Sequence, residues 1–279
     1  MNFIIFDLEW NTVFDKKQKK HLGEIVEIGA VKLNENFELI GEFSETIKPR
    51  INAHLKKRTT KLTGIKDSDL INSKDFVEVT EVFQTFAGDI EENVFLSWSD
   101  SDIRTFSENF NYHFNDSKIP FINYYVDLQE YFMKNLKIVN SDQISLQNAL
   151  DMLNIKCDKS KLHRAVNDAA LSAECFKKVF DESNFNKFIK ILDEKFYNRL
   201  TFVPFYVNDI NSPLIDKNIF KSKCIFCGRE LKNMDDWKFK HNYFVNKALC
   251  ENCNKGYFIR ISYKKFYDKL NCSKQIKEI

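Results

Sequence analysis

The amino-acid sequence predicts an α/β fold in which helices flank one mixed sheet, followed by a small C-terminal module with four cysteines. Three observations predict it. Buried strands and helical segments alternate through residues 1–180, an order typical of α/β domains. Two Cys-x-x-Cys pairs occur near the C-terminus. The net charge also changes sign, from −6 in residues 1–220 to +8 in residues 221–279.

Five segments are expected to be strands of the sheet. Phe3–Trp10 is almost continuously apolar up to its end, as expected of a buried strand, and Glu24–Leu33 and Leu39–Ile47 follow as two more strands of a meander. Val94–Trp98 and Tyr124–Leu128 are shorter buried strands.

Helical segments separate and follow these strands, and we expect them at Asp67–Ile71, Val77–Ile90, Ile103–Phe114, Ser145–Leu153 and Arg164–Phe180. The third is expected to begin directly after Asp102, whose carboxylate would accept hydrogen bonds from its first turn. In the last, small and apolar side chains recur at helical spacing, so that one face packs against the sheet.

Glycine scarcity excludes several nucleotide-binding motifs. The chain has 7 Gly and 4 Pro among 279 residues, which excludes collagen-like and linker-rich sequences. No glycines have the spacing of G-x-G-x-x-G or G-x-x-x-x-G-K, and no G-x-S-x-G element occurs. Phosphate chemistry in this chain is therefore expected to proceed without a glycine-rich loop.

Membrane and secretion signals are absent from the sequence. It has no run of 18 apolar residues, and its first residues lack the basic start and long apolar stretch of a signal peptide. We therefore expect a cytoplasmic protein with no membrane partner, whose cysteines serve as thiols or metal ligands. Cys157, Cys175 and Cys272 are scattered and are expected to be small apolar side chains.

The change of charge sets the expected domain boundaries. A turn-rich stretch from Asn208 to Pro213 precedes the first cysteine pair. We expect a domain of residues 1–207, a linker of residues 208–220 and a basic module of residues 221–279. A basic module beside an acidic domain is typical of a contact with nucleic acid.

Acidic residues stand at the ends of three expected core elements. Asp7 and Glu9 end the first strand and point to one face, because strand side chains alternate. Asp102 follows another buried strand, and Asp168 lies among small apolar residues of the last helix. Each has an ordinary explanation when taken alone, such as a solvated strand edge or a helix cap. Together, four carboxylates gathered in a core require cations.

Carboxylate oxygens suit Mg²⁺ or Mn²⁺, and two such ions are the arrangement used for in-line attack at phosphorus. His163 stands five residues before Asp168. An imidazole close to such a site is suited to take the proton of the attacking water, because its pKa lies near neutral pH.

The order D-x-E, then D, then H-x-x-x-x-D resembles the DEDDh group of 3′–5′ exonucleases, in the superfamily of polymerase proofreading subunits. The stretches Glu27–Val31, Leu62–Ile65 and Ser145–Leu150 add to this resemblance, which covers roughly residues 1–180. The Trp98–Asp102 segment is most similar to the ERI-like branch, which processes RNA ends and includes bacterial sporulation-inhibitor (KapD-type) relatives.

This resemblance implies an RNase H-like fold and an enzyme that removes 5′-mononucleotides from the 3′ end of single-stranded RNA or DNA. It implies that Asp7 bridges two metal ions and that Glu9 and Asp168 complete the site of the attacking water. It further implies that Asp102 binds the other ion and that His163 is the general base.

Asp100 is an alternative to Asp102, from which it stands two residues away. The family pattern W-x-x-x-D, followed by a helix with an aromatic residue four positions on, favours Asp102, with Phe106 as that aromatic residue.

Four residues are candidates for contact with the substrate. Trp10 either stacks on the terminal base or sugar or belongs to the core, and Trp98 is a second aromatic candidate. Lys16 and Lys17 belong to a basic run that either holds phosphates or is a solvated hairpin tip.

The four paired cysteines, Cys224, Cys227, Cys250 and Cys253, have the spacing of a tetrahedral Zn²⁺ site. Such a site is structural because four thiolates leave no open position, and a redox role would need a βαβ setting that the module lacks. The module resembles a zinc ribbon. Its aromatic and basic side chains either bind single-stranded nucleic acid or, for the aromatic ones, form a small core: Trp237, Phe239, Tyr243, Phe244, Tyr257 and Phe258.

Two other functions compete with the exonuclease. A regulatory protein, similar to sporulation inhibitors, would use the exonuclease fold and the zinc module to dock a protein partner. A nucleic-acid binder would bind the same strands without turnover.

Overall fold

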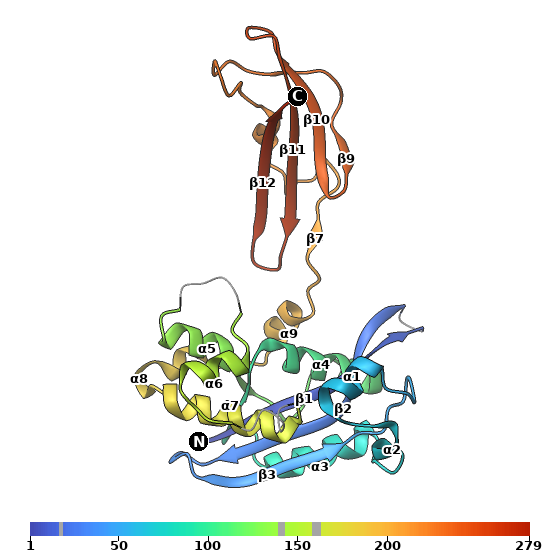
Figure 1. Cartoon of the computed structure of the whole chain (residues 1–279), viewed down its shortest axis with the longest axis vertical. Helices are drawn as coiled ribbons and strands as arrows, with labels where there is room; N and C mark the ends of the chain where they lie inside the picture. Colours follow the sequence, from blue (N-terminus) through green and yellow to red (C-terminus); the bar gives the residue numbers. More distant parts are fainter. Residues whose placement is uncertain (17–18, 139–142, 158–162) are drawn as a thin grey trace. The chain divides into compact units, whose positions relative to one another are not determined.

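The computed structural model describes residues 1–16, 19–138, 143–157 and 163–279. They form two compact units, Met1–Leu200 and Thr201–Ile279, each built on its own sheet (Figure 1). Lys17, a candidate for contact with the substrate, lies outside the described residues. Within the described part of the chain, no helix combines the length and apolar character needed to cross a membrane.

The first unit contains a six-stranded mixed sheet in the order β3-β2-β1-β4-β5-β6. Its strands are β1 (Asn2–Asp15), β2 (Lys20–Leu33), β3 (Leu39–Thr46), β4 (Asn93–Ser97), β5 (Tyr124–Asp127) and β6 (Lys190–Ile191). Strands β1 to β3 form the predicted antiparallel meander, and β4 and β5 add parallel strands on the other side of β1. The predicted mixed, RNase H-like sheet is confirmed.

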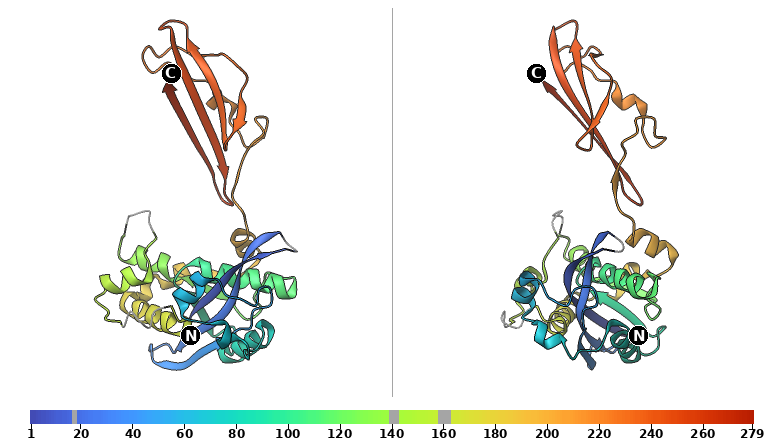
Figure 2. Two further views of the ribbon diagram at one scale, coloured as in Figure 1. Left: turned by 45° about the vertical axis from the view of Figure 1, so that its right-hand side comes forward. Right: turned by 90° about the vertical axis from the view of Figure 1, so that its right-hand side faces the viewer.

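Helices cover both faces of this sheet (Figure 2). They are α1 (Lys57–Thr63), α2 (Asp67–Leu70), α3 (Phe76–Ala87), α4 (Asp100–Phe114), α5 (Leu128–Asn135), α6 (Leu146–Met152), α7 (Ala165–Val179), α8 (Glu182–Phe185), η2 (Asn186–Phe188) and α9 (Glu194–Leu200). Two apolar clusters result, one between the sheet and α3 with α4, the other between the sheet and α5, α6 and α7.

The alternation of β1 divides its side chains between the two clusters. Ile4, Phe6 and Leu8 pack in the cluster with α3 and α4. Phe3 and Ile5 pack in the cluster with α7. Asp7 and Glu9 continue the same alternation as Phe3 and Ile5, so their side chains lie on the face of the sheet that α7 covers. They stand where the apolar cluster on that face ends.

Several predicted boundaries are wrong: β1 continues to Asp15, β2 begins at Lys20, and α3 ends at Ala87. At two further boundaries, a local cap acts earlier than expected. Helix α4 begins at Asp100 rather than after Asp102, since the hydroxyl of Ser99 accepts a hydrogen bond from the amide of Ser101. Strand β5 ends at Asp127, whose carboxylate accepts from the amide of Glu130 and starts α5. The short helices α1, α5, α8 and α9 were not predicted, since one or two turns leave little periodic signal.

Gly29 allows α7 to approach the sheet closely. A Cβ at this position would lie only 2.0 Å from the amide nitrogen of Val166 and 2.2 Å from the carbonyl carbon of Ala165. Gly29 is paired with Asp7 across β1 and β2. The absent side chain therefore lets the first turn of α7 lie directly beside the carboxylates of β1.

The second unit is an antiparallel sheet in the order β12-β11-β10-β8, with β7 paired to β11 and β9 paired to β10. Its elements are β7 (Phe205–Tyr206), η3 (Lys217–Phe220), β8 (Lys232–Asn233), β9 (Lys238–Lys240), β10 (Tyr243–Cys250), β11 (Lys255–Lys265) and β12 (Leu270–Glu278).

The segment predicted as a linker, residues 208–220, packs within this second unit. Ile215 is buried, and Ile219 and Phe220 contact the apolar cluster formed by Phe244, Ile259 and their neighbours on the sheet. These apolar side chains cover one face of the sheet. The functional division at residues 207 and 221 stays a prediction.

Candidate active site

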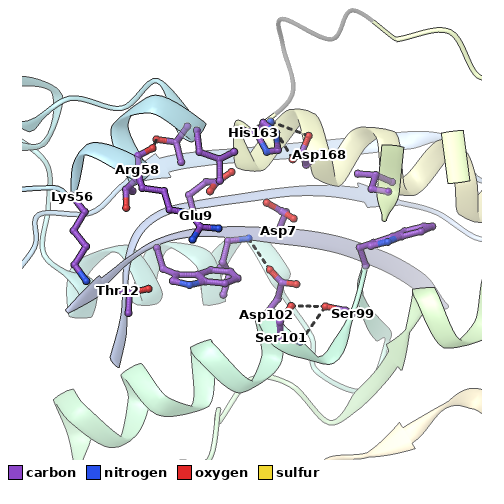
Figure 3. Close-up of a pocket in the computed structure, with 17 residues that line it drawn as sticks. Asp7, Glu9, Thr12, Lys56, Arg58, Ser99, Ser101, Asp102, His163 and Asp168 are labelled. Atoms are coloured by element: carbon purple, nitrogen blue, oxygen red, sulfur yellow. Dashed lines mark hydrogen bonds between the residues drawn. The ribbon is translucent and has the colours of Figure 1, made fainter. Parts of the chain in front are cut away.

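A cavity of about 620 Å³ opens beside β1 in the first unit (Figure 3). Residues of β1, α1, α6, the start of α4 and the start of α7 line it. All five predicted catalytic residues are among the lining residues: Asp7, Glu9, Asp102, His163 and Asp168. Segments distant in sequence therefore bring the predicted set to one cavity.

The start of α7 brings Asp168, in its first turn, and His163, two residues before the helix, to the carboxylates of β1. The backbone amide of His163 donates to both carboxylate oxygens of Asp168, at 3.2 and 3.3 Å. Ligand atoms of Glu9, His163 and Asp168 lie within 4.8 Å of one another. His163 itself is exposed and has a left-handed backbone, with φ of 64°. Its imidazole is thus open to solvent beside two carboxylates.

Asp102, rather than Asp100, faces the cavity. Asp102 is 4% exposed, and its Oδ1 accepts a hydrogen bond from the amide of Leu8 at 3.1 Å. Asp100 is exposed and forms an ion pair of 3.2 Å with Arg104 on the outer side of α4. The early start of α4 produces this difference, because it places Asp102 in the first turn, pointing back toward β1.

Burial and mutual repulsion disfavour the charged forms of these acids. Burial, followed by the charges of Asp168 and Glu27, raises the pKa of Glu9 to about 8. Burial raises the pKa of Asp102 to about 7, although the amide of Leu8 opposes the shift. Burial and the neighbouring carboxylates also raise the pKa of Asp7, and burial raises that of Asp168. All four need compensating positive charge to be ionised together near neutral pH.

Glu27 and Arg164 hold the start of α7 against the sheet. In the sequence, Glu27 opened a stretch that adds to the family resemblance, but neither residue was assigned a role. Glu27 is fully buried and faces Glu9 across β1 and β2. Its carboxylate accepts hydrogen bonds from Nε and Nη2 of Arg164, at 3.0 and 2.6 Å. It also accepts from the amide of Ala165 at 3.1 Å, which satisfies a free N–H of the first turn. Glu27 is therefore a positioning residue for His163 and Asp168.

Asn11 anchors α1 beside the cavity and is another residue that sequence reasoning missed. Its side chain is fully buried, and its Oδ1 accepts from the amide of Lys56 and the hydroxyl of Thr59. This anchor brings Lys56 and Arg58 to the cavity wall. The sequence gave no signal for Asn11, because the expected first strand ended at Trp10 and only the structure extends β1 to Asp15.

The predicted substrate-contacting residues are placed differently from one another. Trp10 lines the cavity, is partly buried and also packs against the core cluster of α3 and α4. Trp98 lines the cavity but is only 8% exposed, and its indole N–H donates to the carbonyl of Ile144. Lys16 is exposed beyond the end of β1 and is not among the lining residues.

The four paired cysteines of the second unit converge, with their sulfur atoms within 4.8 Å of one another. The sulfur atoms of Cys227 and Cys250 are 3.5 Å apart, and those of Cys224 and Cys253 are 4.0 Å apart. The hydroxyl of Tyr257 lies 3.1 Å from the sulfur of Cys224. Four thiol groups this close, outside any helix, form a group that could bind zinc.

An RNase H-like sheet with a cavity lined by acidic side chains defines this protein as a nuclease by class. Residues 4–176 match the exonuclease family (RNase_T), and the chain belongs to this family. Over 193 residues it is 27% identical to the DNA polymerase III subunit epsilon of Aquifex aeolicus (strain VF5), covering 64% of this chain and 81% of that protein.

Solved structures share the fold at low sequence identity. The nuclease domain of 3′hExo, a DEDDh family member bound to rAMP, is 18% identical, with a TM-score of 0.57 over 69% of this chain and 96% of that chain. A full-length 3′-exonuclease is 20% identical, with a TM-score of 0.55 over 63% of this chain. This chain spans 59% of the length of that second protein.

We predict that the stability of the protein falls as the pH rises when no divalent cation is added. The pKa values of Glu9 and Asp102 are about 8 and 7 in the fold and near 4 in the unfolded chain, so the unfolded chain ionises first between pH 4 and 8. Calorimetry should show a lower Tm at pH 8 than at pH 5, and each 1 kcal/mol of lost stability should lower the Tm by about 2–4 °C.

Added Mn²⁺ should restore the Tm at pH 8 and change it little at pH 5, where the acids are protonated. Asp102→Asn should reduce both effects, and the control Asp100→Asn should leave them unchanged. A Tm at pH 8 that does not change when Mn²⁺ is added contradicts the interpretation that these carboxylates bind divalent cations.

Proposed function

We propose that this chain is a metal-dependent 3′–5′ exonuclease that removes 5′-mononucleotides from the 3′ end of single-stranded RNA or DNA. The observation that carries the proposal is the convergence of four carboxylates and one exposed imidazole on a single cavity of an exonuclease domain. The 3′–5′ direction is supported by the resemblance to DEDDh enzymes and by the likeness in fold to 3′-exonucleases.

Asp7, Glu9, Asp102 and Asp168 would hold two Mg²⁺ or Mn²⁺ ions. The donor set fits these ions, because it consists of carboxylate oxygens, and burial followed by the neighbouring carboxylates raises the pKa values of Asp7 and Glu9. When bound, the ions would lower the pKa of an attacking water and offset charge on the phosphate.

The remaining chemistry falls to side chains of the cavity. His163 would take the proton of the attacking water, since its imidazole is exposed and lies beside Glu9 and Asp168. The Glu27–Arg164 pair would keep that imidazole and Asp168 in place relative to β1.

Substrate would contact basic and apolar side chains that line the cavity around the carboxylates. Lys56 and Arg58 supply positive charge there, suited to the phosphates on the 5′ side of the scissile bond. Trp10 and Leu146 supply apolar surface that suits the terminal base, and Trp98 contributes what remains exposed of its ring. Because apolar surface does not distinguish sugars, both RNA and DNA stay in the proposal.

In the second unit, Cys224, Cys227, Cys250 and Cys253 would hold one structural Zn²⁺. The ion would stabilise the turns at both cysteine pairs, where Gly228 and Asn254 adopt left-handed backbone conformations. Within the described residues, no observation favours the regulatory protein-binding function over the nuclease, and a protein partner of this unit stays a prediction of the sequence.

A pair of neighbouring substitutions tests the nuclease. Asp102→Asn should slow the shortening of a 5′-labelled oligonucleotide from its 3′ end in Mn²⁺ by at least about 100-fold, because even outer partners of a metal site cost up to that much. Asp100→Asn removes the same charge two residues away and should keep most of the activity, since Asp100 pairs with Arg104 outside the cavity. Equal activities of the two variants would sink the assignment.

Elemental analysis of the purified chain tests the zinc site. We expect about one zinc per chain, as four thiolates complete one tetrahedral ion. Cys227→Ser should lose it, and the control Cys272→Ser should retain it, because Cys272 is exposed on β12 away from the cluster. Full zinc content in Cys227→Ser argues against the site.

A further inference from the structure

The sheet of the second unit has one face that its own apolar core does not use. Its inner face carries the buried side chains of Phe244, Ile259 and Ile261, which the segment with η3 covers. The opposite face of β10, β11 and β12 (Figure 1) is named here the outer face. Its residues follow from the strand register, since directly paired residues lie on the same side of a sheet.

Three rows of paired residues define the outer face. Tyr243 lies level with Ser262 and Ser273, by the continuing register of β10, β11 and β12. The next rows are Val245 with Arg260 and Gln275, and Lys247 with Phe258 and Lys277. At the edges, the pairing adds Tyr206 opposite Lys264, and Lys238 and Lys240 opposite Val245 and Tyr243.

Charge on the outer face is of one sign. Its basic side chains are Lys232, Lys238, Lys240, Lys247, Arg260, Lys264 and Lys277. Among the described strand positions of this face, none is Asp or Glu. Two acidic residues near this face form ion pairs. Glu251 pairs with Lys232 at its margin, and Glu278 pairs with Lys255 on the inner side. The net charge of +8 in residues 221–279 is therefore concentrated on one surface.

Aromatic rings are interleaved with these cations. The guanidinium of Arg260 lies 5.1 Å from the centre of the Tyr243 ring, and the ammonium of Lys264 lies 5.3 Å from the Tyr206 ring. Phe258 stands between Lys247 and Lys277 in the register. The residues that carry these three rings, Tyr206, Tyr243 and Phe258, are all partly exposed. The partial exposure of Phe258 is notable because its side chain is entirely apolar.

We propose that the outer face binds single-stranded nucleic acid, with bases stacked on Tyr206, Tyr243 and Phe258 and phosphates held by the surrounding Lys and Arg side chains. Rings and cations interleaved on an open surface suit a strand whose bases are unpaired, because a duplex covers the flat sides of its bases. This extends the proposed function with a second contact for nucleic acid but does not depend on catalysis.

The alternating pattern of aromatic and basic residues left two interpretations open, and the register separates them. Phe244 and Tyr257 belong to the core, as their full burial shows. Tyr243 and Phe258 precede and follow these two residues directly and point the other way. Consecutive residues of each strand thus serve the core and the proposed surface in turn.

Binding without turnover tests this proposal. The full-length chain with Asp102→Asn is titrated into 5′-fluorescein dT₁₂ and rU₁₂ in Mg²⁺, and affinity is read from fluorescence anisotropy at several salt concentrations. Adding Tyr243→Ala or Phe258→Ala should weaken affinity by about 10-fold each, within the range found for loss of one stacked base. Arg260→Ala and Lys277→Ala should each reduce the slope of log affinity against log salt by about 0.7.

Matched controls separate this surface from general charge and from misfolding. Phe226→Ala and Lys217→Ala remove an exposed ring and an exposed cation elsewhere in the second unit and should change neither quantity. Tyr243→Phe and Phe258→Tyr keep a ring and should retain affinity. Unchanged affinity in the outer-face variants overturns the proposal, and so do equal losses of affinity in the control variants. Competition by poly-glutamate as strong as competition by dT₁₂ also overturns it and would indicate an acidic protein partner.

The outcome is separable from that of the nuclease. In the chain with Asp102 intact, Tyr243→Ala should cleave a trinucleotide at the parental rate, since that substrate is too short to need a second surface. If no chain shows nuclease activity but the outer-face variants lose binding, the proposed catalysis is contradicted and the proposed binding surface is supported.

Discussion

Repulsion among buried carboxylates is the constraint on which the first unit depends. Asp7, Glu9, Asp102 and Asp168 line one cavity, and burial, joined by the charges of neighbouring carboxylates, raises their pKa values. Such an arrangement lowers stability unless a ligand supplies positive charge. A protein that keeps it near neutral pH therefore gives up folding free energy, which the divalent cations proposed for this site would return on binding.

The surrounding structure holds the carboxylates together against this repulsion. Gly29 removes the side chain that would separate α7 from β2, and Glu27 fastens the start of α7 through Arg164 and the amide of Ala165. The amide of Leu8 holds Asp102. Glu27 adds a further negative charge beside Glu9, and Arg164 offsets it, so the anchoring pair fixes the geometry without neutralising the site.

The alternation of side chains along a strand made the placement of the acidic residues predictable from the sequence. Features that depend on contacts between distant segments could not be predicted. Asp7 and Glu9 could be placed on one face because a strand has a period of two residues. The role of Glu27 could not, because its partner Arg164 is 137 residues away and only the fold brings them together. Helix α4 was predicted to start too late, since Ser99 rather than Asp102 caps it. The aromatic residues of the second unit could be sorted into core and surface only once the register of β10 and β11 was known.

Anomalous X-ray scattering from crystals grown with Mn²⁺ tests the central claim most directly. The account predicts manganese peaks between the carboxylates of Asp7, Glu9, Asp102 and Asp168, with β1 and the start of α7 in the positions described. A cavity without manganese at neutral pH, or one in which a lysine or arginine side chain enters to neutralise the four acids, would contradict it.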